Sequence, residues 1–594
     1  MMSTQKYTVN QYMIESLLTW VNDKEIVIPE IQRPFVWESS KVRDFIDSLY
    51  QGYPVGYIIS WKNPNVRLKN GQVSEGKKIL IDGQQRITAL TTAILGEKIV
   101  DKNYQQIQIK IAFNPIEEKF ETLTPAIAKN KRWIDDISII TKESMFKIVK
   151  KYFKLNPDIE NEEQIEKAME KLFSITRKQI GMIELSPELD IEEVTEIFIR
   201  INSKGVELSQ ADFAMSKIAA NEKYKGVTLR KIIDYFSHLA VNPSFEINDE
   251  EFKDSNFFQK IIWLKKENLN LYIPTYKDIL RVAFTYKFNR GRLSDLVSLL
   301  SGRNFETREY EEEIEQESFE VLNKGIEDFV NEYNFKNFIT IILSAGFIDS
   351  KLIRSQNALN FAYILYLKLK EQKYPYHLIN KYVKKWFVLS LLTGRYSGSS
   401  DSVFDEDIKK ISKKDFSVFL QEIQDAKLSN AFWDFELVQK LETSVTSNPV
   451  FNVFLASQCF FGDRAFLSKD MLVRHLIEQR GDIHHIFPKK ILQDMGYNRG
   501  MYNQVANYVY TETNTNIKIG KTSVEVYTKE VLAQCKTKTI KYGTIDNKDK
   551  LIENLKQNAI PEEIFDMKME NYEEFLELRR KLMSKKIKKY YEEL

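Results

Sequence analysis

The sequence predicts an α+β protein of several domains, and three observations support this. A chain of 594 residues is too long for one hydrophobic core, so we expect about three domains. Strand-like segments and glycine turns mark its first part, helical spacing of apolar residues its middle, and a histidine pair its last part. The expected domains are an α+β domain over 1–212, a mostly α-helical spacer over 213–432 and a third domain over 433–594.

Composition excludes several classes of protein. The net charge is only +2, so any surface for nucleic acid must be local. The two cysteines, Cys459 and Cys535, are too few for a disulfide scaffold or a four-cysteine zinc ribbon. The N-terminal residues lack the pattern of a signal peptide, and no apolar run reaches the roughly 18 residues of a membrane span. These features predict a cytoplasmic protein without a membrane partner.

The first motif is IQRPFVW at 31–37. Gln32 and Arg33 precede a proline, which stiffens the turn and disfavours helix before it. A helix capped near Ser39 or Ser40 follows, with apolar residues on one face. A strand is then expected at 57–61.

The second motif is DGQQR, which consists of Asp82, Gly83, Gln84, Gln85 and Arg86. It follows a strand-like segment at 77–81, forms a tight turn and begins a helix. The free N–H groups of a helix start favour an anion, and the guanidinium of Arg86 suits a phosphate. In the alternative interpretation Asp82 only caps the helix and Arg86 pairs with a surface acid.

The third motif is FIRINSKGVELS at 198–209, where helical spacing gives way to a polar loop. In one interpretation Arg200, Asn202 and Lys204 converge on a phosphate or a base. The alternative is that they form a solvated loop.

The three motifs, in this order and at these separations, resemble the N-terminal domain of GmrSD-type restriction endonucleases. The resemblance implies a ParB/sulfiredoxin-like fold that binds and hydrolyses a nucleoside triphosphate, with GTP as the first candidate. It further implies that residues 82–86 line the nucleotide site, with Gln32 and Arg33 close by and Arg200, Asn202 and Lys204 supporting it. In some relatives this domain also senses modified DNA. No Walker A motif is present in the sequence.

The C-terminal part contains the motif GDIHHIFPKK at 481–490, with His484 and His485 side by side. A second segment at 505–521 contains two further candidates, Asn507 and Asn516. Adjacent residues of a strand point to opposite sides, so the two histidines cannot do the same job. Phosphodiester cleavage needs an activated water and a Lewis acid, so one histidine can face a metal while the other addresses the water.

The two segments resemble the ββα-metal, or HNH, nuclease motif. The resemblance implies that His485 is the general base and that His484 and Asn516 hold a divalent metal. Asn507 would fix the ring of His485, and Lys518 would neutralise phosphates of the scissile strand. Histidine replaces the commoner aspartate at the metal position, which leaves Mg²⁺ and Mn²⁺ both open. A purely structural role for the histidine pair is the alternative.

Local charge favours contact with DNA. From 489 to 550 there are eleven Lys/Arg against six Asp/Glu, and Lys521 belongs to this excess. A second basic run, 579–589, is either a solvated helix face or a contact to the DNA backbone. Asp482 is either an acid that supports the metal ligands or the end of a strand. Residues 560–582 also resemble the C-terminal domain of the GmrSD type.

The resemblances predict a nucleotide-dependent and metal-dependent DNA endonuclease that restricts modified phage DNA. In this interpretation, nucleotide hydrolysis in the N-terminal domain regulates the HNH nuclease. One alternative is a nicking effector that responds to phosphorothioate modification of the DNA backbone. Another is a ParB-like, nucleotide-gated DNA-binding regulator with an inactive HNH end. A homo-oligomer is possible, because one HNH site cuts one strand.

Overall fold

A computed structural model describes the protein in two compact units. The described residues are 6–23, 25–27, 35, 37–62, 78–100, 106–189, 194, 197, 210–221, 223–247, 249–479, 481 and 483–594. The first unit comprises Met1–Asn268, Thr275–Lys277 and Leu296–Glu320. The second comprises Leu269–Pro274, Asp278–Asp295 and Val321–Leu594. The division at 212 and 432 stays a prediction.

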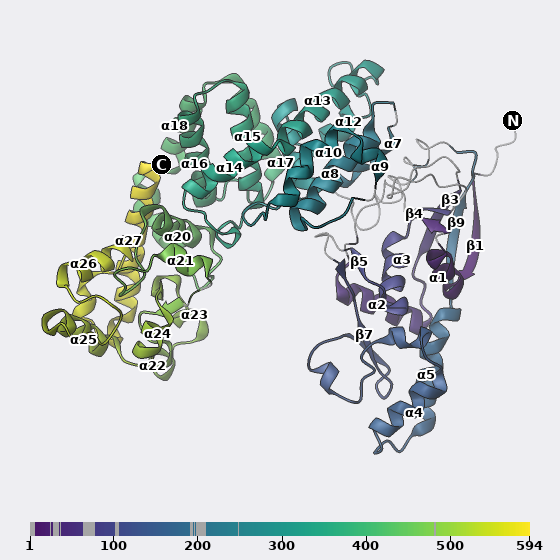
Figure 1. Ribbon diagram of the computed structural model, residues 1–594, viewed down its shortest axis with the longest axis horizontal. Coiled ribbons are helices and arrows are strands. Elements are labelled where there is room, and N and C mark those ends of the chain that lie inside the picture. Colours follow the sequence, from purple (N-terminus) through teal and green to yellow (C-terminus); the bar gives the residue numbers. More distant parts are fainter. Residues whose placement is uncertain are drawn as a thin grey trace. The chain divides into compact units, whose positions relative to one another are not determined.

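A five-stranded mixed sheet organises the first unit, in the order β1-β9-β3-β4-β2 (Figure 1). Its strands are β1 (Tyr7–Met13), β2 (Ile26–Val27), β3 (Tyr57–Lys62), β4 (Lys78–Asp82) and β9 (Gln179–Leu185). The pairs β1/β9 and β3/β4 are antiparallel, and the pairs β3/β9 and β2/β4 are parallel. The mixed α and β character expected from the sequence is confirmed.

Apolar side chains cover both faces of this sheet. Leu80 belongs to the larger core, together with Ile58, whereas the next residues, Ile81 and Ile59, belong to a smaller cluster. Alternation along the strands produces this division. Helices α1 (Ile14–Asn22), α2 (Ser39–Gln51) and α3 (Gln84–Leu90) contribute to the larger core.

The rest of the first unit consists of short hairpins and helices. They are β5 (Ile99–Val100), β6 (Gln106–Ile107), β7 (Ile111–Asn114), β8 (Lys119–Thr122), η1 (Thr91–Leu95), η2 (Ile127–Lys129), η3 (Ile137–Thr141), α4 (Met145–Leu155), α5 (Glu162–Phe173), η4 (Ser174–Arg177), α7 (Gln210–Ala220), α8 (Gly226–Val241), α9 (Glu250–Lys253), α10 (Asn256–Ile261) and η5 (Ile262–Lys266). The π-helical turn η1 continues α3 directly, and η3 packs against η1.

The second unit begins with helices whose aromatic residues interlock. The division between the units falls within three helices, so Tyr276–Lys277 of α11, Leu296–Leu299 of α12 and Glu312–Glu320 of α13 belong to the first unit. The helices from 276 to 461 are α11 (Tyr276–Phe288), α12 (Leu293–Leu299), α13 (Glu312–Val330), α14 (Glu332–Ser344), η6 (Ser350–Leu352), α15 (Gln356–Glu371), α16 (Tyr376–Thr393), α17 (Ser400–Lys413), α18 (Phe416–Lys427), η7 (Phe432–Glu436), α19 (Leu437–Lys440) and α20 (Pro449–Phe461). Tyr363 of α15 stacks on Phe338 of α14 with ring centroids 4.6 Å apart. The helical spacing read in the middle of the sequence reflects such buried faces.

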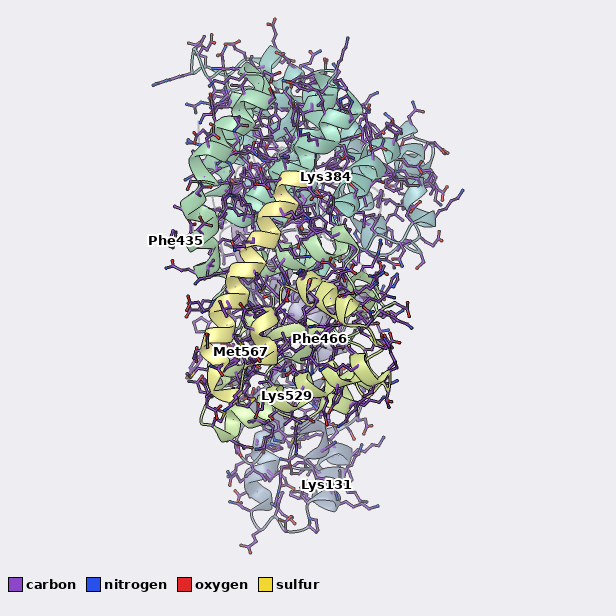
Figure 2. The ribbon with its side chains drawn as sticks, turned by 90° about the vertical axis from the view of Figure 1, so that its left-hand side faces the viewer. Lys131, Lys384, Phe435, Phe466, Lys529 and Met567 are labelled. Carbon is purple, nitrogen blue, oxygen red and sulfur yellow. The ribbon has the colours of Figure 1, made fainter. Side chains whose placement is uncertain are left out.

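The C-terminal part of the second unit combines one short hairpin with helices. Its elements are α21 (Val473–Glu478), β10 (Ile483–His485), α22 (Lys489–Asp494), α23 (Arg499–Tyr502), η8 (Val505–Asn507), β11 (Tyr508–Tyr510), α24 (Thr513–Ile519), α25 (Val524–Thr537), α26 (Lys548–Gln557), η9 (Glu562–Phe565), η10 (Met569–Asn571) and α27 (Tyr572–Glu593). Helix α27 is the long helix that extends from near Met567 to near Lys384 in Figure 2.

Helix α27 ties the hairpin to the helices before it. Arg579 is fully buried, and its guanidinium donates hydrogen bonds to the carbonyl oxygens of Ala506, Tyr508 and Asn558 at 2.7, 2.8 and 3.2 Å. Farther along the helix, the hydroxyl of Tyr590 donates to the carbonyl oxygen of Ala345. Arg579 therefore lies neither on a solvated helix face nor at a contact with the DNA backbone, the two interpretations of the basic run at 579–589. It stabilises the buried backbone around β11 instead.

Candidate active site

The hairpin β10–β11 presents the two histidines in opposite directions. In its antiparallel register His484 lies opposite Val509, and His485 lies opposite Tyr508. His484 is 4% exposed, whereas His485 is partly exposed. After β11 the chain turns into α24, which carries Asn516. Two paired strands and a helix after them are what the HNH resemblance implies, and here α22, α23 and η8 lie between the two strands.

The ring of His484 faces Asn516. Its Nδ1 lies 2.8 Å from the Oδ1 of Asn516, and the ring stacks on Phe466 with centroids 6.2 Å apart. Burial lowers the pKa of His484 to about 4, against the opposing effect of the Asn516 hydrogen bond. The imidazole is therefore neutral at pH 7, which is the form that binds a metal.

The residues around His484 fit a weakly held divalent metal. Two ligand atoms in adjacent positions about 2.1 Å from one ion lie about 3 Å apart, which matches the separation of His484 Nδ1 and Asn516 Oδ1. In this structure the proton of His484 lies on Nδ1, because the Oδ1 of Asn516 can only accept a hydrogen bond. A metal at Nδ1 would require that proton to move to Nε2, which is buried and has no hydrogen-bond partner among the described residues. No cluster of three His, Cys, Asp or Glu suited to a metal occurs in the described part. Water and phosphate oxygens would complete the coordination.

The second histidine has a different partner. The Nε2 of His485 lies 3.0 Å from the Oδ1 of Asn503, which can only accept a hydrogen bond. Nε2 therefore carries the proton, and Nδ1 keeps a free lone pair. Burial lowers the pKa of His485, the hydrogen bond to Asn503 opposes this, and Lys489 adds to the lowering. A neutral His485 can accept a proton from water at physiological pH.

Asn507 does not hold the ring of His485, and this corrects the sequence-based expectation. Its Oδ1 accepts a 2.8 Å hydrogen bond from the N–H of Phe487, and its Nδ2 donates to the carbonyl oxygens of Phe487 and Tyr502. Asn507 is fully buried and ends η8, so its side chain faces the backbone that leaves β10. It fixes the path of the chain beside the histidines. The orienting partner is Asn503, four residues earlier.

A pocket of about 290 Å³ opens over the histidines. It is lined by Ile483, His484, His485, Pro488, Lys489, Lys490, Gln493, Asn516 and Gly520. Three predicted residues, His484, His485 and Asn516, thus meet in one cavity. Lys518 is exposed on α24 and does not line it. The sequence reading missed Gln493 and Asn503 as site residues, and it counted Lys489 and Lys490 only as part of the basic excess.

The DGQQR turn lies in the first unit, at the end of β4. Gly83 has a φ of 92°, in the left-handed region, and an added Cβ would lie 3.1 Å from the Cα of Ile58. Glycine is required here by both the turn and this close approach. Helix α3 begins at Gln84, whose buried Oε1 has no hydrogen-bond partner among the described residues.

Arg86 folds back from the start of α3. Its Nε donates 2.8 Å to the carbonyl oxygen of Val55, and one NH group donates to that of Tyr57. Asp82 lies 3.8 Å from the same guanidinium and makes no cap, since Gly83 occupies that position. The pairing of Arg86 with an acid agrees with one half of the second interpretation of the motif, whereas the helix cap that it assigned to Asp82 is not formed. Gln85 follows in α3 and is half-buried. The remaining predicted nucleotide-site residues lie outside the described residues, as does Asp482: they are Gln32, Arg33, Arg200, Asn202 and Lys204.

Comparison with known proteins connects the first unit with restriction enzymes. Residues 14–219 match the family model described as "GmrSD restriction endonuclease, N-terminal domain". This match supports a relation to GmrSD-type restriction endonucleases and indicates a restriction-endonuclease type of role, with DNA as a partner.

The chain is also similar to the "Uncharacterized protein MJ0686" of Methanocaldococcus jannaschii. The two are 24% identical, over 95% of this chain and 96% of that protein. The similarity therefore spans both units. Among the described helices, none has the length and apolar character needed to cross a membrane.

Proposed function

We propose that the chain is a divalent-metal-dependent DNA endonuclease of the HNH type, controlled by a nucleoside triphosphate in the first unit. The observation that carries the nuclease is the arrangement on β10, β11 and α24. One neutral histidine faces an amide oxygen at the distance of two adjacent metal ligands, and the next histidine faces away with a fixed tautomer.

The residues have separate roles in strand cleavage. His485 accepts the proton of the attacking water at Nδ1, while Asn503 holds the proton on Nε2. His484 and Asn516 would hold Mg²⁺ or Mn²⁺, which supplies charge stabilisation to the phosphate when it is bound. Lys489 and Lys490 line the pocket and attract the backbone of the strand. Exposed Lys518 contacts phosphates outside the pocket.

The control site is the DGQQR turn. The buried, unsatisfied Gln84 Oε1 and the left-handed Gly83 at the start of α3 support a polar ligand here, and GTP is the first candidate. The match of residues 14–219 to the GmrSD N-terminal domain supports modified DNA as the substrate, with phage restriction as the outcome. Because one HNH site cuts one strand, double-strand cleavage would need two copies of the chain or two successive binding events at the same DNA site.

Nicking of supercoiled plasmid and of modified phage DNA tests the proposal. We expect nicks with Mg²⁺ or Mn²⁺ and their loss in His485→Ala and Asn516→Ala. His475→Ala is the matched control, because His475 is exposed on α21 and does not line the pocket. Unmodified, hydroxymethylated, glucosylated and phosphorothioated DNA, each with and without GTP, identify the substrate. A purified His485→Ala protein that nicks DNA as fast as the native protein would contradict the nuclease assignment.

A further inference from the structure

A second cavity, of about 490 Å³, lies in the first unit between η2, η3 and α4. It is far from the DGQQR turn. The segment from Gln84 to Leu95 is twelve residues of helix, which spans about 18 Å. The DGQQR turn is at its start, whereas η3 packs against its end, where the hydroxyl of Thr141 donates to the carbonyl oxygen of Ile94. The volume suits a ligand the size of a nucleotide.

The walls of this cavity combine aromatic and apolar groups. Trp133 is half-buried in the wall. Tyr152 is held in place, because its hydroxyl donates 3.0 Å to the carbonyl oxygen of Arg132. Ile134 and Ile148 complete the apolar surface. A flat ring is the shape that stacks on such a wall.

Charged groups of both signs line the cavity, and besides the lysines these are Asp135, Asp136 and Glu143. Lys131, labelled in Figure 2, and Lys151 of α4 are exposed at the cavity and form no ion pair within the described part of the chain. The Oε2 of Glu143 is buried and accepts no hydrogen bond from a described residue, although the ammonium of Lys147 lies 3.4 Å away. A ligand that satisfies all three carries an anionic group for the lysines and an N–H donor for the carboxylate.

The geometry points to this cavity as a binding site for a nucleotide unit whose base bears an amino group. The base stacks on Trp133, its amino group donates to Glu143, and its phosphate lies against Lys131 and Lys151. DNA is one source of such a unit, since a base turned out of the double helix exposes its face and its edge. A free mononucleotide is the other source. The DNA source rests on the function proposed above and would give the first unit its own contact with the substrate.

Binding of labelled oligonucleotides to the full-length His485→Ala protein tests this site. The assay contains EDTA and no nucleoside triphosphate, so it depends neither on cleavage nor on the DGQQR turn. Three duplexes are compared: a fully paired one, one with a single unpaired cytosine and one with a single unpaired thymine. Because only cytosine carries the amino group, we expect the cytosine duplex to bind most tightly. Unlabelled dCMP, added as competitor, separates the two sources of the ligand.

Substitutions assign the binding to the cavity. Trp133→Ala removes the stacking surface and should weaken binding of the cytosine duplex about tenfold or more. Lys151→Glu and Lys131→Glu should weaken it as well, and both positions are exposed, so these variants test the site even if Trp133→Ala does not fold. Lys150→Glu is the matched control, because it makes the same change of charge at an exposed residue of the same helix that does not line the cavity.

The outcomes separate clearly. Loss of duplex binding in the cavity variants without competition by dCMP supports DNA as the source, and competition by dCMP supports the free nucleotide. Equal affinity for all three duplexes, together with no effect of dCMP, would overturn the site. So would unchanged binding in Trp133→Ala, Lys131→Glu and Lys151→Glu. Either result would leave metal-dependent nicking by the native protein untouched.

Discussion

The Nε2 of His485 lies 3.0 Å from the Oδ1 of Asn503. In the sequence, His485 precedes the segment that contains α22 and α23, and Asn503 follows it. This pair sets which nitrogen of the ring keeps its lone pair, and so which atom can take a proton. In the proposed mechanism the corresponding pair for the metal is His484 and Asn516, whose Nδ1 and Oδ1 lie 2.8 Å apart. Two neighbouring histidines therefore each have an asparagine partner, and each asparagine supports a different chemical role.

The first prediction concerns Asn503. Asn503→Ala should lower the nicking rate about 10- to 100-fold, because the ring of His485 loses its orientation. Asn503→Asp keeps the acceptor and adds a negative charge, which raises the pKa of His485. The acid limb of the pH–rate profile should then move to higher pH. An unchanged pH profile in Asn503→Asp would show that this residue does not act through His485.

The second prediction concerns the metal. EDTA should stop nicking. The nicking rate restored by added Mn²⁺ should exceed the rate restored by Mg²⁺, because a neutral imidazole is a poor ligand for Mg²⁺. His484→Asp supplies a carboxylate and should shift the preference toward Mg²⁺. Nicking rates with titrated Mn²⁺ and Mg²⁺ measure this ratio in both proteins. A ratio that is the same in both would contradict a ligand role for His484.

The third prediction concerns stability against pH. Burial lowers the pKa of His484 to about 4, whereas an unfolded histidine titrates near 6.5. The unfolded chain therefore binds more protons between these values, and stability contributed by neutral His484 is lost as the pH falls from about 6.5 to 4. The loss amounts to about 3 kcal/mol. The free energies of unfolding of the native protein and of His484→Leu, measured with urea, should differ by an amount that changes with pH in this range. A difference that does not depend on pH would contradict the lowered pKa of His484.

The fourth prediction concerns Arg579. Arg579→Lys has one nitrogen in place of the two that donate to these carbonyl oxygens, so it should lower the free energy of unfolding by about 2 to 4 kcal/mol. Nicking should fall as well, since Ala506 and Tyr508 flank Asn507 and Tyr508 begins β11. Lys581→Ala is the control on the exposed face of α27. Equal thermal unfolding temperatures for Arg579→Lys and Lys581→Ala would show that the buried guanidinium contributes little to the stability of the protein.

The fifth prediction separates the two ends of the chain. Arg86→Gln should abolish hydrolysis of GTP and the dependence of cleavage on GTP, while nicking without nucleotide continues. Arg177→Gln, an exposed arginine of the first unit with no ion pair among the described residues, should hydrolyse GTP normally. Phosphate release and plasmid nicking are measured on the same preparations. Normal hydrolysis by Arg86→Gln would argue against the DGQQR turn as the nucleotide site.

Local patterns predicted much of the backbone. The strand expected at 57–61 is β3, the one at 77–81 is β4, and the helix expected near Ser39 is α2. The turn at Gly83 and the hairpin with the histidine pair also follow the sequence. Periodicity and turn residues encode these features within a few positions, so neighbouring residues are enough to read them.

Side-chain contacts between residues that are far apart in the sequence could not be predicted from local patterns. Asn503 and Asn507 are both asparagines near β11, and only the path of the chain through α23 and η8 decides which one reaches His485. Arg579 stands in a basic run, yet it is buried by contacts with carbonyls about seventy residues earlier. Arg86 turns onto backbone that precedes it by about thirty residues. Each contact depends on tertiary packing, which overrides local composition.

The support of β11 by Arg579 has a consequence for how the protein is made. Arg579 follows Ala506 by 73 residues, so both histidines and both asparagines leave the ribosome before the side chain that holds their strand. During synthesis the hairpin stays unsupported until α27 has emerged. A nascent chain can therefore stabilise this hairpin only after residues 572–593 have been made, when the residues of the first unit have already been synthesised.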